Sequence, residues 1–156
     1  MVLSKRMECV ASMVTPGGRL ADVGCDHGYL PIWLFETGRI AGAVAMDIRP
    51  GPLERAKANI AQHGLGQYIQ TRLSDGMEKL APGEVDSAIL AGMGGKLMVR
   101  ILSESPGTVQ SLRELVLEPQ SETAALNPDW VEWLMGFPKQ WTDLSCGNGN
   151  LSAFRV

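Results

Sequence analysis

The segment LADVGCDHGYLP (residues 20–31) indicates the architecture of the whole chain. It begins as a short apolar strand, passes through a turn that contains Gly24 and Gly28, and enters a helix that begins near Tyr29. In α/β proteins, a strand followed by a glycine turn and a helix N-terminus brings the backbone close to a nucleotide-like ligand. We therefore expect a ligand site at this turn.

Two carboxylates, Asp22 and Asp26, give the turn its chemical character. A turn that binds a pyrophosphate presents glycines and backbone N–H groups, and nearby negative charge would repel the anion. The cationic end of an amino acid is favoured there instead, and S-adenosylmethionine carries an ammonium and a sulfonium. The turn therefore indicates a methyl donor, and an NAD-dependent oxidoreductase is disfavoured.

The composition is that of one soluble globular domain. Of the 156 residues, 45% are apolar and 20% charged, and no run approaches the roughly 18 apolar residues of a membrane helix. No apolar segment of a secretory signal follows Lys5 and Arg6. The widely separated Cys9, Cys25 and Cys146 suggest neither a metal site nor a disulfide framework. We therefore expect a reduced, cytoplasmic protein.

The net charge of −3 does not indicate a nucleic-acid-binding protein, because affinity for phosphate backbones depends on clustered Lys and Arg. The distribution of these residues is more informative than their sum. Eleven of the fourteen lie within residues 1–100. Any polyanion is therefore expected to bind the N-terminal part of the chain.

Predicted helices and strands alternate after an amphipathic helix at residues 3–14. Strands are expected near 19–23, 42–47, 68–73, 85–91 and 112–117, with helices near 29–37, 52–62 and 96–103 and a short helical turn near 76–80. This alternation predicts right-handed βαβ units and a parallel sheet that helices cover on both faces.

The composition changes after about residue 127. A helix near 129–136, capped by Asn127, and an antiparallel hairpin of strands near 141–146 and 151–156 are expected to complete a seven-stranded sheet. Trp130, Trp133 and Phe137 share one helical face, and packing against the core or a partner is favoured over base stacking. The chain is predicted to be a single domain, with an N-terminal helix (1–18), a ligand-binding core (19–120) and an atypical tail (121–156).

Unusual residues gather where α/β sheets bind their ligands, at the carboxyl ends of the predicted strands. These loops are Asp22–Gly28, Asp47, Asp75-Gly76 and Gly92–Gly95. Asp47, 19 residues after Gly28, either holds ribose hydroxyls or is a solvated residue at a strand end. Asp75 either contacts an adenine amino group or caps its own turn.

Two residues of the first loop also have structural interpretations. Cys25 is interpreted as a small residue in a tight turn rather than a nucleophile, and no Pro-Cys pair supports a cytosine C5 mechanism. His27 is either a ligand contact or a residue that bonds the backbone at the start of a helix.

Four motifs together carry a resemblance to one family. They are DVGCDHGYLP, MDIRPGPLERAKANI, SDGMEKLAPGEVDSAILAGMGG and LVLEPQ. With them, residues 3–120 resemble the bacterial tRNA adenine-22 N1-methyltransferases of the TrmK type. The Asp-His pair in the first glycine loop and the Ala-Gly-Met-Gly-Gly after the fourth strand are not general features of methyltransferases, so the resemblance is specific.

The resemblance implies a Rossmann-like class I methyltransferase that uses S-adenosylmethionine, acts on tRNA and holds no metal. The donor-binding residues that it implies are Asp22, Gly24, Cys25, His27, Gly28, Asp47, Ile48, Asp75, Gly76, Ala91, Gly92 and Met93. The substrate-binding residues that it implies are Lys5, Arg6, Tyr29, Gly94 and Gly95.

The chemistry of this family requires placement more than activation. Adenine N1 is a ring lone pair that needs alignment with the sulfonium methyl group and no covalent catalyst. A carboxylate that accepts a hydrogen bond from the exocyclic amine would raise the electron density at N1, and Asp26 is the expected catalytic residue.

The end of the chain departs from the family pattern. Family members carry a coiled-coil C-terminal domain that helps to hold tRNA, and the sequence stops before such a segment. Residues 127–144 are instead similar to a C-terminal segment of phage-type DNA methyltransferases. Two alternatives therefore accompany tRNA methylation: a DNA methyltransferase, and a catalytically silent module that binds the donor.

Overall fold

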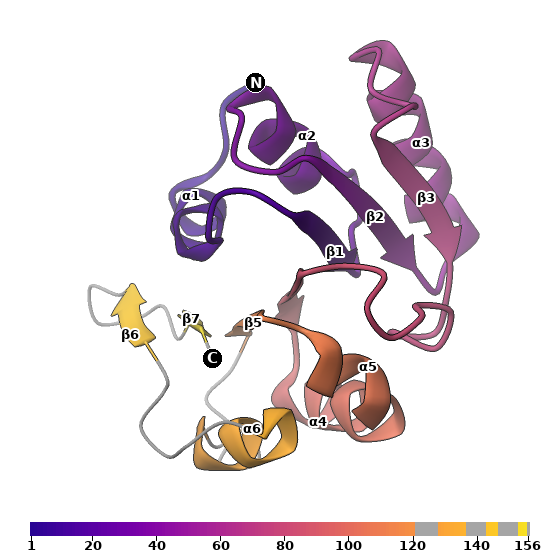
Figure 1. Cartoon of the computed structure of the whole chain (residues 1–156). Coiled ribbons are helices and arrows are strands. Elements are labelled where there is room, and N and C mark those ends of the chain that lie inside the picture. Colours follow the sequence, from indigo (N-terminus) through magenta and orange to yellow (C-terminus); the bar gives the residue numbers. More distant parts are fainter. Residues whose placement is uncertain (121–127, 137–142, 147–152, 156) are drawn as a thin grey trace.

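The computed structural model describes residues 1–120, 128–136, 143–146 and 153–155. Within these residues the chain forms a single seven-stranded sheet between two layers of helices (Figure 1). The strands are β1 (Arg19–Val23), β2 (Gly42–Asp47), β3 (Ile69–Leu73), β4 (Ser87–Met93), β5 (Glu114–Pro119), β6 (Asp143–Cys146) and β7 (Ala153–Arg155).

The strand order is β3-β2-β1-β4-β5-β7-β6. The first five strands pair in parallel, whereas β7 pairs antiparallel with both β5 and β6. The order reverses between β1 and β4, and such a switch point opens a crevice at the carboxyl ends of the strands. The predicted fold class, a mostly parallel sheet with an antiparallel C-terminal pair, is confirmed.

Helices α1 (Lys5–Met13), α2 (Tyr29–Glu36) and α3 (Pro50–Gln62) cover one face of the sheet, and α4 (Gly95–Glu104), α5 (Pro106–Ser111) and α6 (Pro128–Met135) cover the other (Figure 1). Helix α5 was not predicted because it is only six residues long and contains Gly107. The prediction of a helical turn near 76–80 is wrong. This segment forms two successive turns, in which the Asp75 and Met77 carbonyls accept hydrogen bonds from the N–H groups of Glu78 and Leu80.

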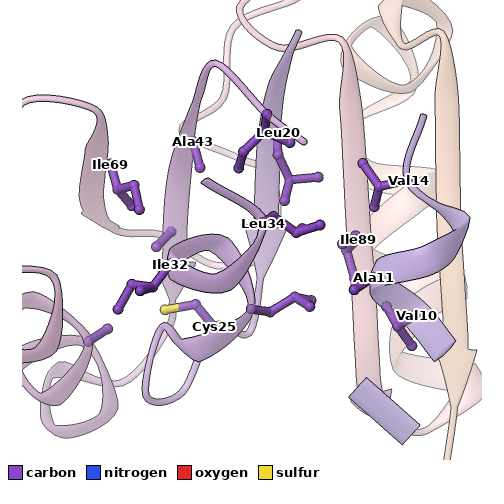
Figure 2. Packing of buried hydrophobic residues seen from close by; sticks show 14 of the residues in the cluster. Val10, Ala11, Val14, Leu20, Cys25, Ile32, Leu34, Ala43, Ile69 and Ile89 are labelled. Carbon is purple, nitrogen blue, oxygen red and sulfur yellow. The ribbon is translucent and has the colours of Figure 1, made fainter. Parts of the chain in front are cut away.

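Two buried clusters follow from the alternation of side chains along the strands. Leu20 and Ile89 belong to the cluster on the α1–α3 face, and their neighbours Ala21 and Leu90 belong to the cluster on the opposite face. Figure 2 shows side chains of α1 and α2 packed against the first of these faces. A fully buried Leu or Ile contributes about 1.5–3 kcal/mol, so both helical layers are held mainly by apolar contact.

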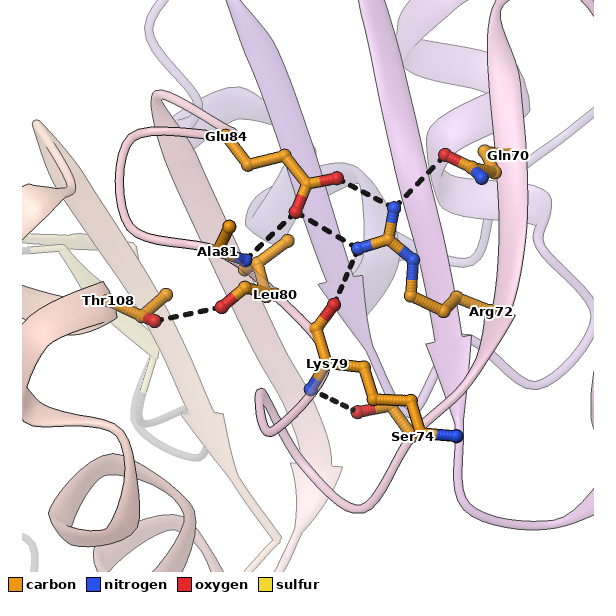
Figure 3. A network of polar contacts seen from close by, with 8 residues as sticks. All are labelled: Gln70, Arg72, Ser74, Lys79, Leu80, Ala81, Glu84 and Thr108. Atoms are coloured by element: carbon orange, nitrogen blue, oxygen red, sulfur yellow. Dashed lines mark hydrogen bonds and ion pairs between the residues drawn. The ribbon is translucent and has the colours of Figure 1, made fainter.

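A polar network fixes the connection between β3 and β4 (Figure 3). The Arg72 guanidinium donates to both carboxylate oxygens of Glu84, at 2.6 and 3.0 Å, and to the Lys79 carbonyl at 2.6 Å. The hydrogen bond from Arg72 lowers the pKa of Glu84 to about 2. The Lys79 N–H in turn donates to the Ser74 hydroxyl, so the network also fixes the loop that follows β3.

The tail packs on the sheet through α6. Val131, Leu134 and Met135 are buried in the cluster on the α4–α6 face, and Trp130 is partly buried against it, which agrees with the packing interpretation of Trp130. Asn127, Phe137 and the turn predicted between β6 and β7 lie outside the described residues. None of the described helices has the length and apolar character that crossing a membrane requires.

The cysteines depart from the expectation in one respect. Cys25 is a buried free thiol, whereas Cys9 is disulfide-bonded. The expectation that the chain forms no disulfide is therefore wrong for Cys9. Wide separation in the sequence does not exclude a disulfide, because the bond depends on the distance between the two residues in space.

Candidate functional site

A cavity of about 610 Å³ lies at the carboxyl ends of the parallel strands. The four predicted loops meet at its wall, together with Arg6 from α1. The predicted site residues that line it are Arg6, Asp22, Gly24, Cys25, Asp26, Asp47, Ile48, Asp75, Gly76, Ala91, Gly92 and Met93. Lys5, His27, Gly28, Tyr29, Gly94 and Gly95 are not among the lining residues.

Two buried carboxylates, Asp22 and Asp47, mark the ends of β1 and β2 on the cavity wall. Asp47 accepts a hydrogen bond from the Arg49 backbone N–H at 2.9 Å. Burial, and secondarily the charge of Asp47, raises the pKa of Asp22 to about 7. No hydrogen bond from a described residue reaches the Asp22 side chain. Among the described residues this carboxylate therefore lines the cavity without a hydrogen-bond donor, and a bound cation would stabilise its charged form.

The backbone of the first loop is fixed by the neighbouring strand. The N–H groups of Gly24 and Cys25 donate to the Met46 carbonyl at 2.8 and 2.9 Å. Gly24 has a φ of +80°, a conformation that glycine adopts easily. Burial and the nearby Asp22 raise the pKa of the Cys25 thiol, which keeps it neutral and agrees with the interpretation of Cys25 as a small turn residue.

Asp26 occupies the exposed part of the same loop. Its φ of +42° is rare for a residue other than glycine, and its side chain is 56% exposed while still lining the cavity. The Arg55 guanidinium lies 3.5 Å from one carboxylate oxygen, and His27 Nε2 lies 3.8 Å from the other. The loop thus presents an accessible carboxylate at the entrance of the cavity.

His27 and Gly28, the next two residues, contact α3 and do not line the cavity. The His27 carbonyl accepts a hydrogen bond from the Asn59 side chain at 2.9 Å. The imidazole ring of His27 stacks on the Tyr29 ring, with the two centroids 5.1 Å apart. A Cβ atom at Gly28, whose φ is +70°, would lie 3.2 Å from the Ala56 Cβ. The structure thus gives Gly28 a packing role, and the ligand contacts implied for these residues stay predictions.

The loop after β3 is held by α4. Asp75 receives two contacts from the Arg100 guanidinium, at 3.0 and 3.4 Å. A Cβ atom at Gly76 would lie 2.9 Å from the side chain of Ile101, so only glycine allows this close approach. The carboxylate predicted to contact an adenine amino group is therefore already ion-paired on the cavity wall.

The loop after β4 is connected to α1 through a buried carboxylate. Glu118, at the end of β5, accepts a hydrogen bond from the Gly92 N–H at 2.9 Å. The Arg6 guanidinium lies 2.7 Å from the same carboxylate oxygen. Arg6 therefore lines the cavity as the partner of Glu118, while Lys5 is exposed and Gly94 and Gly95 form the start of α4.

Several residues that line the cavity were not predicted from the sequence. They are Met7, Val23, Leu30, Arg49, Ser74, Leu97, Arg100, Ile101 and Gln120. Gln120 follows the end of a strand, so the rule that identified Asp47 would also have found it. Leu97, Arg100 and Ile101 lie at helical spacing in the helix that directly follows a glycine loop, which places one helical face toward the same edge.

Metal chemistry finds no support in the part of the chain that the structure describes, because no group of three or more His, Cys, Asp or Glu residues there is placed to hold a metal ion. The sheet order, the acidic residues at the ends of β1 and β2 and the cavity beside them define the Rossmann-like fold of class I methyltransferases.

Comparisons with known proteins agree with this class. A family model described as a methyltransferase domain matches residues 3–134, and the chain therefore belongs to the methyltransferase-domain family. It is 36% identical over 132 residues to the tRNA (adenine(22)-N(1))-methyltransferase of Bacillus subtilis, which covers 85% of this chain and 54% of that protein. The chain spans about half the length of the curated relatives it matches.

Solved structures give the same result over nearly the whole chain. A Streptococcus agalactiae protein described as a member of the NADB-Rossmann superfamily matches with a TM-score of 0.87 and 32% identity, covering 99% of this chain and 68% of that one. Streptococcus pneumoniae Sp1610, in complex with S-adenosyl-L-methionine, matches with a TM-score of 0.81 and 35% identity, covering 99% and 72%.

Proposed function

We propose that this chain transfers a methyl group from S-adenosylmethionine to N1 of adenine in tRNA. The observation that carries the proposal is Asp22, a buried carboxylate on the cavity wall with no hydrogen-bond donor among the described residues. A buried charge requires a partner, and the ammonium of the donor's amino-acid part supplies one. The relatives named above support the donor and the tRNA substrate.

The donor is assigned to the first three loops. Asp22 would hold the ammonium, and Asp47, beside Ile48, would accept hydrogen bonds from the ribose hydroxyls. Asp75, with Gly76, would accept a hydrogen bond from the adenine amino group. The donor supplies an electrophilic methyl group on a sulfonium, so the protein needs to provide no nucleophile of its own.

The acceptor adenine is assigned to the entrance of the cavity, between Asp26 and the loop at Ala91–Met93. Asp26 would accept a hydrogen bond from the exocyclic amine and so raise the electron density at N1. The Arg55 guanidinium, 3.5 Å from this carboxylate, competes for its lone pairs. The remaining contribution is orientation, because in-line placement of the two reactants lowers the barrier without any covalent intermediate.

The direct test uses the full chain with labelled S-adenosylmethionine and unmodified tRNA. We expect N1-methyladenosine in the digested tRNA, detected by mass spectrometry. Asp26→Asn should bind the donor normally but lower kcat by about ten- to a hundredfold, as expected for loss of one positioned catalytic group. A normal rate in this variant would remove Asp26 from the mechanism.

Two alternative functions are outcomes of the same experiment. The resemblance expected from the sequence of residues 127–144 would make DNA the acceptor, and methylation of DNA but not of tRNA would support this alternative.

The second alternative is a silent module that binds the donor. Tight binding of a polyanion needs a longer basic surface than the exposed Lys5 and the half-exposed Arg6 provide. Donor binding without methyl transfer to either nucleic acid would support this alternative.

A further inference from the structure

Arg100 is a charged residue of the cavity wall whose role in ligand binding the preceding assignments leave open. It lies on α4, the helix that follows the β4 loop, yet its guanidinium reaches across to the loop that follows β3. There it contacts both carboxylate oxygens of Asp75, at 3.0 and 3.4 Å. Both residues line the cavity, and both side chains are 41% exposed.

The Arg100 side chain is itself anchored one helical turn further along α4. Glu104 lies 3.0 Å from the same guanidinium, in an i,i+4 pair. These hydrogen bonds, that with Asp75 foremost, raise the pKa of Arg100. An isolated pair at this exposure would contribute little to stability, but a guanidinium held by two carboxylates has a fixed orientation, since its planar fork matches carboxylate geometry.

A carboxylate offers two lone pairs on each oxygen. The two contacts from Arg100 occupy one side of the Asp75 carboxylate, which leaves the remaining lone pairs for a ligand in the cavity. The backbone of this loop is fixed independently, because the Ser74 N–H donates to the Asp47 carbonyl at 3.0 Å and Gly76 packs on Ile101. Arg100 therefore determines the orientation of the Asp75 side chain and not that of its backbone.

We propose that Arg100 is a positioning residue that orients Asp75 to accept the exocyclic amine of the donor's adenine, and so determines the preference for an adenosyl donor. This inference rests on the proposed function, in which Asp75 contacts the donor's base. Arg100 acts through Asp75 in this role. A purine that carries a carbonyl in place of the amine has no donor at that position, and its oxygen would face the fixed carboxylate, so the site should bind it more weakly.

The test compares two ligands by calorimetry: S-adenosylhomocysteine and S-inosylhomocysteine, in which a carbonyl replaces the amine. We expect the wild-type protein to bind the adenosyl compound at least tenfold more tightly, in line with the ratio expected for one hydrogen bond to a charged group. Arg100→Met keeps the aliphatic stem and removes the donors, and it should reduce this ratio to about threefold or less. Arg100→Lys keeps the charge without the fork and should fall between the two.

Three further measurements keep the proposal falsifiable. Lys96→Met, at an exposed position of the same helix, is the matched control and should keep the wild-type ratio. Glu104→Gln leaves Asp75 intact and weakens only the ion pair between Glu104 and Arg100. It should lower the ratio of the two affinities about twofold, and this test remains available if Arg100→Met folds poorly. In steady-state assays, Arg100→Met should raise KM for the donor with little change in kcat.

The outcomes separate this inference from the proposed function. If the wild-type protein fails to bind S-adenosylhomocysteine, the proposed function is contradicted, and this inference with it. If the wild-type protein binds and discriminates but folded Arg100→Met discriminates equally well, only the role of Arg100 is overturned. A wild-type protein that binds both compounds equally would remove Asp75 from base recognition and contradict the inference as well.

Discussion

The Asp22 carboxylate combines two properties that oppose each other in the free protein. Burial disfavours its charged form and raises its pKa to about 7, whereas binding of an ammonium requires that charged form. A cation bound nearby favours the ionised carboxylate. Proton release from Asp22 is therefore coupled to donor binding, and the affinity for the donor must increase as pH rises through this pKa.

This coupling predicts a pH dependence for the binding of S-adenosylhomocysteine. Between pH 6 and 7.5 the ionised fraction of a group with a pKa of about 7 rises about eightfold, so we expect the affinity to rise by roughly the same factor and to level off above this range. Asp22→Asn should bind more weakly and lose this dependence, because nothing at position 22 titrates. Calorimetry across this range measures both proteins, and parallel pH profiles would exclude Asp22 as the titrating group.

Site residues such as Asp22 can be predicted from the sequence when a single local rule gives their position in the fold. Asp22 and Asp47 end apolar strands, and the carboxyl edge of a parallel sheet is where ligands bind. Arg100 and Glu118 lack such a signal, because their roles depend on partners that are far away in the sequence. Asp75 precedes Arg100 by 25 residues, and Arg6 and Glu118 come from opposite ends of the described core.

At the scale of the elements, α1 is joined to the cavity by one ion pair. Arg6 reaches Glu118, which is 5% exposed at its side chain and also holds the Gly92 N–H. Removing Arg6 would leave a buried carboxylate with a single backbone donor. Unpaired buried charges are strongly destabilising, although the partial exposure of Arg6 reduces the effect through solvent screening.

A double-mutant cycle measures this connection. We expect Arg6→Met to lower the free energy of unfolding by about 1–2 kcal/mol, and Glu118→Gln, which keeps an acceptor for Gly92, to lower it by about 1 kcal/mol or less. The double variant should recover part of the loss, which gives a coupling energy on the order of 1 kcal/mol. Urea denaturation provides the values, and strictly additive effects would show that the pair contributes no net energy.

The contact between α2 and α3 permits a cleaner comparison, because two glycines share a backbone conformation. Gly28 and Gly38 have φ values of +70° and +71°, but a Cβ atom at Gly28 would lie 3.2 Å from Ala56, whereas a Cβ atom at Gly38 would have no neighbour within 4 Å. Substitution by alanine therefore adds the same backbone strain at both positions and steric contact at one.

We expect Gly38→Ala to destabilise the protein by about 1 kcal/mol, the usual penalty for a Cβ atom in the left-handed region. Gly28→Ala should be worse by a further 1 kcal/mol or more, since the helices must separate. It should also weaken donor binding, because Gly28 ends the loop that contains Asp22. Thermal unfolding and calorimetry are the measurements, and equal losses at both positions would refute a packing role for Gly28.

The predicted helices and strands were accurate where the hydrophobic pattern and the turn residues at the ends of the segment agreed. The segment from Gly42 to Asp47 is apolar and ends in a carboxylate, and its observed bounds are the predicted ones. The short helix at Pro106–Ser111 was missed because six residues contain too little periodicity to detect. The segment at 76–80 was predicted as a short helical turn, but it forms hydrogen-bonded turns, and the Arg72 guanidinium holds its Lys79 carbonyl.

At the scale of the whole molecule, the lining residues of the cavity lie at one edge of the sheet, the carboxyl ends of the parallel strands. Alternating strands and helices predicted the parallel order, and turn residues predicted the antiparallel strands at the C-terminal end. No sequence pattern predicts which side chains face each other across the cavity. That information arises only when the order reverses between β1 and β4 and brings residues from α1, from α4 and from the segments after β3 and β5 to one place.

This placement of the cavity predicts where a bound ligand slows amide hydrogen exchange. With S-adenosylhomocysteine present, we expect slower exchange in peptides that cover 22–28, 47–49, 74–76 and 91–95, the loops at the carboxyl edge. Peptides that cover 38–41, 64–68 and 81–86, at the opposite edge, should keep their rates, since a ligand in the cavity does not reach them and local opening governs exchange there. Mass spectrometry of the digested protein measures both sets in one experiment. Protection confined to the opposite edge would show that the ligand binds elsewhere. Protection spread evenly over both edges would show that the ligand only stabilises the fold in general.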